Sequence, residues 1–241
     1  MIKTIIILIV IIAALAVAVD IFRVAVRVKK GKELSARAVP FQRLNLQAKM
    51  RILILGDSTG VGTGAEDNNL TVAGRFGQAF PDAEIVNKSQ NGWRVHDARE
   101  FLDTADLGKF DLIILQIGAN DIIRFTPLSN FSQNLASIFK RAKAMSPVVA
   151  ALHSGNVGLA PFFPRWIGPL YSWRTRQVRA IYSELASDSG VIYVDLYTDR
   201  AHDPLGADVA KNYAPDGLHL TGAGYGVWYA KIQDALLKAS K

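Results

Sequence analysis

The chain contains no cysteine. This absence excludes disulfide bonds, thiolate nucleophiles and thiolate metal sites together. Internal repeats and low-complexity tracts are also lacking, and half of the 241 residues are hydrophobic while a fifth are charged. Such a composition excludes a disordered, collagen-like or coiled-coil protein, because enough apolar surface is present for a sizeable core.

Most of the chain also lacks net charge. The formal net charge of +7 arises entirely in residues 1–50, which hold 9 Lys/Arg and 2 Asp/Glu. Residues 51–241 hold 19 residues of each sign, so their net charge is zero. A globular part without excess positive charge is poorly suited to follow a phosphate backbone. We therefore expect no nucleic-acid partner.

A long apolar run lies close to the N-terminus. No charged residue occurs from Thr4 to Val19, and a helix of this length spans roughly 24 Å, somewhat less than the ~30 Å hydrocarbon core of a bilayer. If Lys3 and Arg23 snorkel to the two interfaces, the helix reaches nearly across. Residues 1–30 are therefore predicted to be a retained single-pass membrane anchor with a basic juxtamembrane segment, which can lie along anionic headgroups.

Two other interpretations of this run stay open. Ala16-Val17-Ala18 resembles the small-residue cleavage site of a signal peptide, and an apolar helix can also be buried in a core. The basic residues that follow the run argue against easy export and place the following domain on the cytoplasmic side.

The region between the anchor and the first strand pattern has little regularity. Residues 31–50 contain one proline, scattered basic residues and no clear hydrophobic period, which is typical of a linker. We therefore expect residues 1–48 to locate the protein without contributing to its chemistry.

From Arg51 onward, short apolar runs alternate with amphipathic stretches. The expected strands are Ile52–Leu55, Glu84–Asn87, Leu112–Ile117, Val148–Leu152 and Val191–Val194, and the clearest helical patterns are Phe131–Met145, Arg174–Ser187 and Gly222–Lys238. Near-continuous apolar strands joined by helices indicate a parallel sheet covered on both faces. Residues 51–241 are thus predicted to form one three-layer α/β/α domain with a parallel sheet of about five strands.

Polar motifs follow several of these strands. In open parallel sheets, ligands bind where the strands end, and here the chain reads Gly56–Gly60, Asn87–Gly92 and Gly118–Asp121 at such points, with Asp216–His219 before the last helix. The glycine-rich segment 56–64 fits neither the P-loop nor the dinucleotide-binding template. Its glycines then allow a tight strand-to-helix turn, with Asp57 as a turn or cap residue.

The same motifs contain the parts of a serine nucleophile site. Ser58 follows the first strand, and His219 has a carboxylate three residues earlier, Asp216, which suits a base held in one tautomer. The backbone N–H groups of Ser58 and Gly92 and the side-chain amide of Asn120 are candidate donors for an oxyanion. Each motif alone is more often a cap or a turn, but four in this order are uncommon.

In these motifs the chain resembles the SGNH (GDSL) hydrolase family. Gly56-Asp57-Ser58, Asn87 to Gly92, Gly118 to Asp121 and Asp216 to His219 match its four blocks, while Thr59 stands where the family has leucine or isoleucine. The resemblance covers residues 51 to about 240. It implies a flavodoxin-like sheet and an esterase, lipase or thioesterase type of activity.

The sequence indicates the residues that contact substrate less clearly. Trp93 directly follows the glycine of the second block, and His153 follows the fourth strand, so both are candidates to touch substrate; a packed structural histidine is an equal alternative for His153. The aromatic segment 159–173 suits an acyl pocket, a lid, a surface that dips into lipid, or ordinary packing. No cluster has metal-ligand spacing, and no cofactor or metal is implied.

These observations predict a membrane-tethered serine ester hydrolase, similar to an esterase, lipase or lysophospholipase, whose substrate is a small-molecule or lipid ester. Two alternatives share the motifs: an O-deacetylase of envelope carbohydrate, and a catalytically inactive SGNH domain that only binds. The side of the membrane is open, because many members of the family act outside the cytoplasm while the charge rule favours the cytoplasm.

Overall fold

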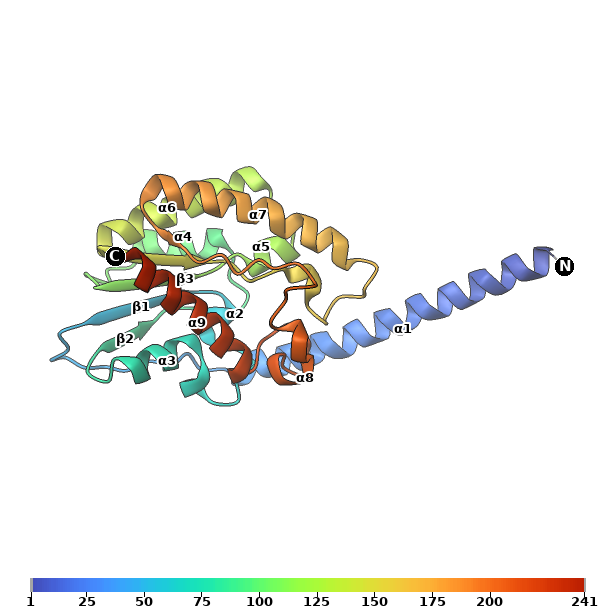
Figure 1. Ribbon diagram of the computed structural model, residues 1–241, viewed down its shortest axis with the longest axis horizontal. Coiled ribbons are helices and arrows are strands. Elements are labelled where there is room, and N and C mark those ends of the chain that lie inside the picture. Colours follow the sequence, from blue (N-terminus) through green and yellow to red (C-terminus); the bar gives the residue numbers. More distant parts are fainter. Residues whose placement is uncertain (1, 241) are drawn as a thin grey trace.

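The computed structural model describes residues 2–240 and contains a long N-terminal helix joined to a layered α/β domain (Figure 1). The strands are β1 (Arg51–Gly56), β2 (Glu84–Asn87), β3 (Leu112–Gln116), β4 (Val148–Leu152) and β5 (Ile192–Tyr193). The longer helices are α1 (Ile2–Arg37), α3 (Val72–Ala79), α4 (Val95–Thr104), α6 (Leu128–Met145), α7 (Gly168–Ser189) and α9 (Gly222–Ala239). Three short helices, α2 (Ser58–Val61), α5 (Ala119–Ile123) and α8 (Val209–Asn212), lie beside the loops.

All five strands are parallel and follow the order β2-β1-β3-β4-β5. The order reverses between β1 and β3, and in such doubly wound sheets the crevice at this point is the usual ligand site. The three-layer prediction is confirmed, and each expected strand lies within two residues of the observed one. The loops after β1, β2 and β3 consequently meet at one edge of the sheet.

Alternation along the strands divides the core into two layers. Successive side chains of a strand point to opposite faces, so Leu53 and Leu55 pack with residues of α4, α6 and α7, while Ile52 and Ile54 pack with residues of α3 and α9. These four side chains are at most 1% exposed. Burial on both faces explains why β1 reads as an unbroken apolar run.

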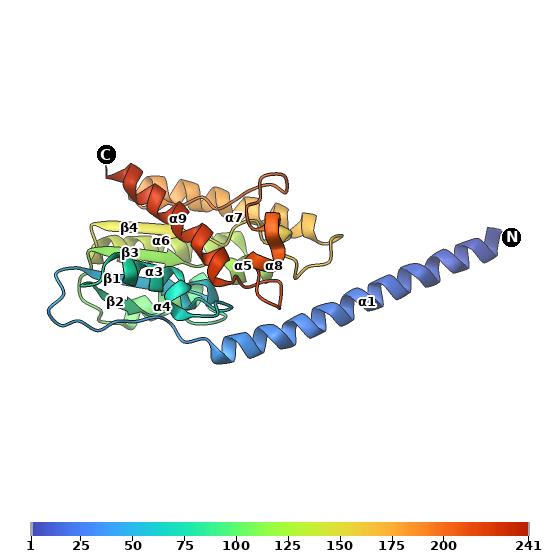
Figure 2. The ribbon, with the colours of Figure 1, turned by 60° about the horizontal axis from the view of Figure 1, so that its bottom comes forward.

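Helix α1 extends far beyond the domain, as Figures 1 and 2 show. Residues 2–19 are exposed along their whole length. The helix is long and apolar enough to cross a membrane, with a mean hydropathy of 3.2 in its most apolar window. From Asp20 onward, in contrast, one side of the helix becomes half-buried against the domain.

The segment after the anchor differs from the expected linker. Helix α1 continues to Arg37, and the backbone of Arg43 pairs with Ile85 of β2 in antiparallel fashion, through N···O distances of 3.0 and 2.9 Å. The Arg43 side chain donates to the carbonyls of Gly77, Phe80 and Ala83. The sequence pattern did not reveal this packing because one edge pairing and one half-buried arginine produce no hydrophobic period.

Candidate active site

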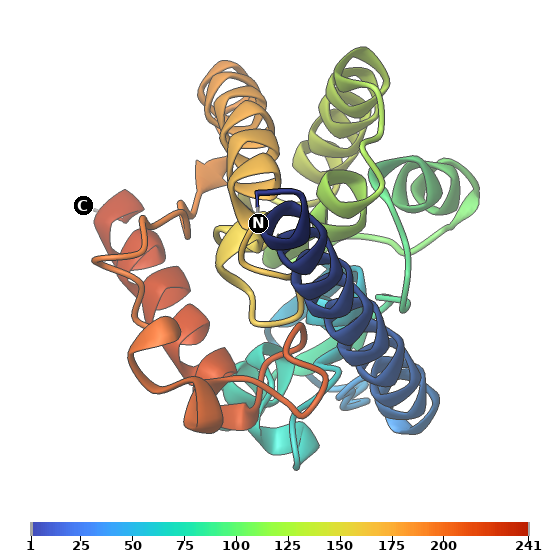
Figure 3. The same ribbon diagram turned by 90° about the vertical axis from the view of Figure 1, so that its right-hand side faces the viewer.

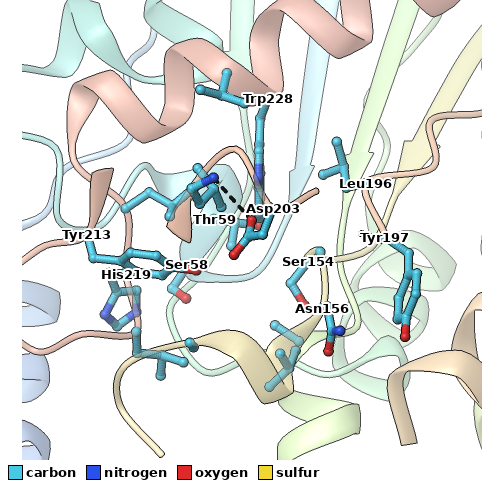
Figure 4. Close-up of a pocket in the computed structure, with 18 of the residues that line it drawn as sticks. Ser58, Thr59, Ser154, Asn156, Leu196, Tyr197, Asp203, Tyr213, His219 and Trp228 are labelled. Carbon is cyan, nitrogen blue, oxygen red and sulfur yellow. Dashed lines mark hydrogen bonds between the residues drawn. The ribbon is translucent and has the colours of Figure 1, made fainter. Parts of the chain in front are cut away.

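A cavity of about 280 Å³ opens at the carboxyl edge of the sheet. Ser58, Gly92, Asn120 and His219 all line it, so residues from four distant parts of the sequence meet there. Figure 4 shows Ser58 and His219 on one side of the cavity, with Ser154 and Asn156 opposite. The convergence results from topology, because the loops after β1, β2 and β3 leave the same edge.

Ser58 is the first residue of α2, directly after the end of β1. Asp57 caps this helix: its Oδ1 accepts hydrogen bonds from the Thr59 backbone N–H at 2.9 Å and from the Thr59 hydroxyl at 2.8 Å. The expectation that Asp57 is a cap residue is confirmed by this geometry. Ser58 therefore sits on a turn whose backbone is held from one side by a buried carboxylate.

The same carboxylate reaches a second loop of the site. Oδ2 of Asp57 accepts a hydrogen bond from the backbone N–H of Ala119 at 3.3 Å, which is the residue before Asn120. Burial raises the pKa of Asp57, and its hydrogen bonds to Thr59 and Ala119 oppose that shift. Asp57 thereby fixes the distance between the Ser58 turn and the start of α5.

His219 and Asp216 form a tight pair behind the cavity. The distance between His219 Nδ1 and Asp216 Oδ2 is 2.5 Å, and the backbone N–H groups of Leu218 and His219 both donate to Asp216 Oδ1 at 3.0 Å. Burial favours a higher pKa for Asp216, but the hydrogen bond and charge of His219 and these backbone donors outweigh it and lower the pKa. The carboxylate stays ionised and favours a proton on Nδ1, which leaves Nε2 as an acceptor.

Gly92 and Asn120 present polar groups to the same cavity. Gly92 has a φ of +83°, a left-handed conformation that a residue with a side chain adopts only at a cost. The Asn120 side chain donates one N–H to the carbonyl of Trp93 at 3.0 Å. Since an amide nitrogen carries two hydrogens, this bond orients the side chain and leaves one donor free.

A second buried carboxylate, Asp121, supports the loop that carries Gly92. Its Oδ2 accepts a hydrogen bond from the backbone N–H of Val95, the first residue of α4, at 3.0 Å. Burial raises the pKa of Asp121 to about 6, and the hydrogen bond from the Val95 backbone opposes the shift. The folded protein therefore binds this proton more strongly than the unfolded chain does.

This raised pKa makes the stability of the domain depend on pH. A carboxyl whose pKa is higher in the folded state loses stabilising free energy as pH rises from about 4 to about 6, here by up to about 3 kcal/mol. Asp121→Asn keeps an acceptor for Val95 but removes the titration. Relative to wild type, this variant should gain stability between pH 4 and pH 7 in denaturant unfolding. Parallel pH profiles for wild type and Asp121→Asn would contradict the assignment.

Two expected substrate contacts are not found at the cavity. The half-buried Trp93 ring packs against Phe101 with a centroid distance of 5.5 Å and contacts the core cluster beside α4. His153 is fully buried, and its Nε2 lies 2.9 Å from the Tyr193 hydroxyl. Burial lowers the pKa of His153 to about 4, so it is neutral. Neither lines the cavity, which removes the geometric basis for assigning them to substrate.

The structure instead adds lining residues that no motif indicated. Ser154 and Asn156 face the cavity, and within residues 2–240 their buried Oγ and Oδ1 atoms have no hydrogen-bond partner. Ser35 of α1 also lines it. Over the same residues, no group of three or more His, Asp or Glu side chains could hold a metal ion.

Comparisons with known proteins agree with this geometry. The family model of the GDSL-like lipase/acylhydrolase family matches residues 54–227, whereas no curated protein matches the chain. The crystal structure of TesA superposes with a TM-score of 0.64 at 21% identity, covering 78% of this chain and 99% of its own. A variant of Axe2, an acetyl xylan esterase from Geobacillus stearothermophilus, gives 0.59 at 18% identity, with 78% and 94% covered.

An extracellular lipase from Streptomyces rimosus is a third structure of this kind, with a TM-score of 0.59 at 14% identity and coverage of 77% of this chain and 99% of its own. At these identities the likeness concerns the fold alone. The family model, in contrast, spans most of the domain, including Ser58, Gly92, Asn120, Asp216 and His219. The chain therefore belongs to the GDSL-like lipase/acylhydrolase family and is a carboxylic ester hydrolase of the SGNH type.

Proposed function

We propose that the protein is a membrane-tethered serine ester hydrolase in which Ser58, His219 and Asp216 form the catalytic triad. One observation carries this proposal: Ser58, Gly92, Asn120 and His219 line a single cavity, and Asp216 is hydrogen-bonded to Nδ1 of His219. A nucleophile, an oriented base and donors for an oxyanion are the three requirements of acyl transfer to serine.

The chemistry follows from these roles. His219 Nε2 takes the hydroxyl proton of Ser58 while Oγ attacks the ester carbonyl carbon, and the negative charge develops on the carbonyl oxygen. The N–H groups of Ser58, Gly92 and Asn120 stabilise that oxygen. His219 then gives its proton to the leaving alcohol, which departs and leaves an acyl-serine ester. Water, deprotonated by His219, cleaves this ester, and the proton returns to Ser58 Oγ.

The lining of the cavity supports an ester with an apolar acyl chain. Beyond Ser58, one part of its wall consists of Ile123, Val157, Leu196, Leu205 and Trp228, which suits hydrocarbon, whereas Asp195, Asp203 and Lys231 add charged groups elsewhere in the lining. On the outside, Trp166 and Trp173 of segment 159–173 are about half exposed or more. Trp166 donates a hydrogen bond to Asp20 at 3.1 Å, where the apolar part of α1 ends, so this segment lies at the level expected for a lipid interface.

A specific observation favours the second candidate, an O-deacetylase of carbohydrate. The unpartnered oxygens of Ser154 and Asn156 match a substrate alcohol that carries hydroxyl groups, because a buried acceptor gains most from a new donor. A binding module without catalysis is the third possibility, but the sequence keeps the serine, asparagine and histidine of the family's motifs.

Hydrolysis of p-nitrophenyl esters from acetate to palmitate distinguishes these candidates. We expect kcat/KM to rise from acetate toward medium or long chains, with no hydrolysis by Ser58→Ala. A maximum at acetate, together with release of acetate from acetylated oligosaccharides, favours the deacetylase. A folded protein that hydrolyses no ester of the series would contradict both enzymatic functions.

The tether has its own test. We expect the intact protein to sediment with membranes and to stay there in 1 M salt, at which the Debye length falls to about 3 Å, because a spanning helix is held by burial of apolar surface. Detergent should release it. Release by salt alone, or a mature protein that begins near Val19, would show that residues 2–19 do not anchor it. Fusions of alkaline phosphatase and a fluorescent protein to the C-terminus report the side of the membrane.

A further inference from the structure

The juxtamembrane half of α1 carries a regular stripe of half-buried residues. They are Asp20, Val24, Arg27, Gly31, Leu34 and Ser35, which mostly recur every three or four positions and so lie on one face of the helix. The stripe begins where the exposed apolar part of α1 ends. Figure 3, which views the molecule from its right-hand side in Figure 1, shows α1 crossing in front of the domain. Helix α1 is thus exposed on all sides up to Val19, and from Asp20 onward one of its faces packs against the domain.

Gly31 of this stripe lies against Asp216. A Cβ atom placed on Gly31 would be 3.0 Å from Asp216 Oδ2, the oxygen that also accepts the hydrogen bond from His219 Nδ1. Asp216 is only 1% exposed, so α1 helps to exclude water from this carboxylate. In a less polar environment the hydrogen bond between Asp216 and His219 is electrostatically stronger. Any side chain at this position would press on the carboxylate, and one larger than a methyl group would have to displace it.

Two further contacts tie α1 to the loops of the site. The carbonyl of Ser35 accepts a hydrogen bond from the side chain of Asn91 at 3.1 Å, and Asn91 precedes Gly92. On the other side, the Arg27 guanidinium donates to the carbonyls of Pro161 and Phe162, while the backbone N–H of Phe162 donates to the carbonyl of Gly217 at 2.8 Å. Helix α1 therefore contacts the loop that carries Gly92. Through residues 161 and 162 it is also linked to the loop that carries Asp216.

We propose that residues 27–35 of α1 form a wall of the active site, and that Gly31 is a positioning residue that holds Asp216 against His219. This inference rests on the proposed function, since it assigns Asp216 to the triad. The membrane anchor and the catalytic domain then form one functional unit. Under this proposal, turnover depends on residues 27–35, whereas the sequence had predicted that residues 1–48 contribute nothing to the chemistry.

The test compares variants of the full chain in detergent micelles, with a short p-nitrophenyl ester as substrate. Gly31→Leu should lower kcat tenfold or more with KM within twofold, because it displaces Asp216 without touching substrate. Gly31→Ala requires a shift of a few tenths of an ångström and should lower kcat severalfold. Since alanine normally stabilises a helix relative to glycine, the thermal stability of this variant should not fall. Ala36→Leu, on the exposed side of the same helix, should leave kcat unchanged.

A double-mutant cycle shows whether Gly31 acts through Asp216. In an Asp216→Asn background, Gly31→Leu should cost less than a further twofold in kcat. Wild-type kcat in Gly31→Leu, or an equal loss with and without Asp216→Asn, would overturn the proposal. If Gly31→Leu does not fold, an unchanged kcat in folded Gly31→Ala has the same meaning. Full activity in Ser58→Ala would instead overturn the proposed function itself.

Discussion

Ser58→Ala should reduce kcat by about 10⁴-fold or more, because the variant has no oxygen with which to form the acyl-enzyme. His219→Ala should be comparably inactive, since removing either partner of such a unit abolishes the same step. Asp216→Asn should lose less, as the histidine is still present although its tautomer is no longer favoured. The measurement is steady-state hydrolysis of a p-nitrophenyl ester, together with labelling of Ser58 by a fluorophosphonate probe.

The matched control is Ser183→Ala, which removes an exposed hydroxyl on α7. Ser183 does not line the cavity. It should retain full activity and the same probe labelling as wild type. Folding of Ser58→Ala is checked by its thermal transition, which we expect to lie close to that of wild type because Ser58 lines the cavity and belongs to neither hydrophobic core cluster. Ester hydrolysis at the wild-type rate by folded Ser58→Ala would rule out Ser58 as the nucleophile.

Asn120→Ala should lower kcat by about 10²–10³, equivalent to roughly 2.7–4 kcal/mol of transition-state stabilisation. The reason is that a neutral amide donor aimed at the oxyanion acts most strongly when charge develops there, so KM should change far less than kcat. The side chain is already oriented by its bond to the Trp93 carbonyl, and little reorganisation is needed during the reaction.

Asn120→Asp and Asn130→Ala sharpen this experiment. The aspartate variant keeps the shape of the side chain but has no N–H, so it should be at least as impaired as the alanine variant. Asn130 is an exposed residue of α6, and its replacement by alanine should have no effect on kcat. If Asn120→Ala instead raised KM and left kcat unchanged, Asn120 would have to be assigned to substrate binding.

Asp57 and Asp121, two of the three buried aspartates of the motifs, connect loops of the site. Asp57 connects the Ser58 turn to Ala119, and Asp121 connects the same region to the start of α4. Each carboxylate accepts backbone N–H groups that would otherwise be unpaired in the interior, which stabilises one arrangement of three loops. The site thus has fixed geometry at the places where donors must face the reacting oxygen.

The sequence alone determined the layered domain and the identity of the polar groups at its edge. Buried parallel strands require continuous apolar runs such as Ile52–Leu55, and a covering helix such as Gly222–Ala239 requires its own period; both are local patterns. Parallel strands joined by helices send their carboxyl ends to one edge. The motifs Gly56–Ser58, Gly118–Asp121 and Asp216–His219 therefore predicted that Ser58, Asn120 and His219 lie at this edge, and all three line the cavity.

Only the tertiary structure decided what surrounds those groups. Trp93 packs against Phe101, and His153 is buried beside Tyr193. Their positions in the sequence, after the ends of strands, had suggested that both contact substrate. The anchor helix packs on Asp216 through Gly31, in a segment whose basic composition resembled a linker or a lipid-facing stretch. The contact between Gly31 and Asp216, which are more than a hundred positions apart, depends on the complementary shapes of two folded surfaces, and neither surface is encoded in a local period.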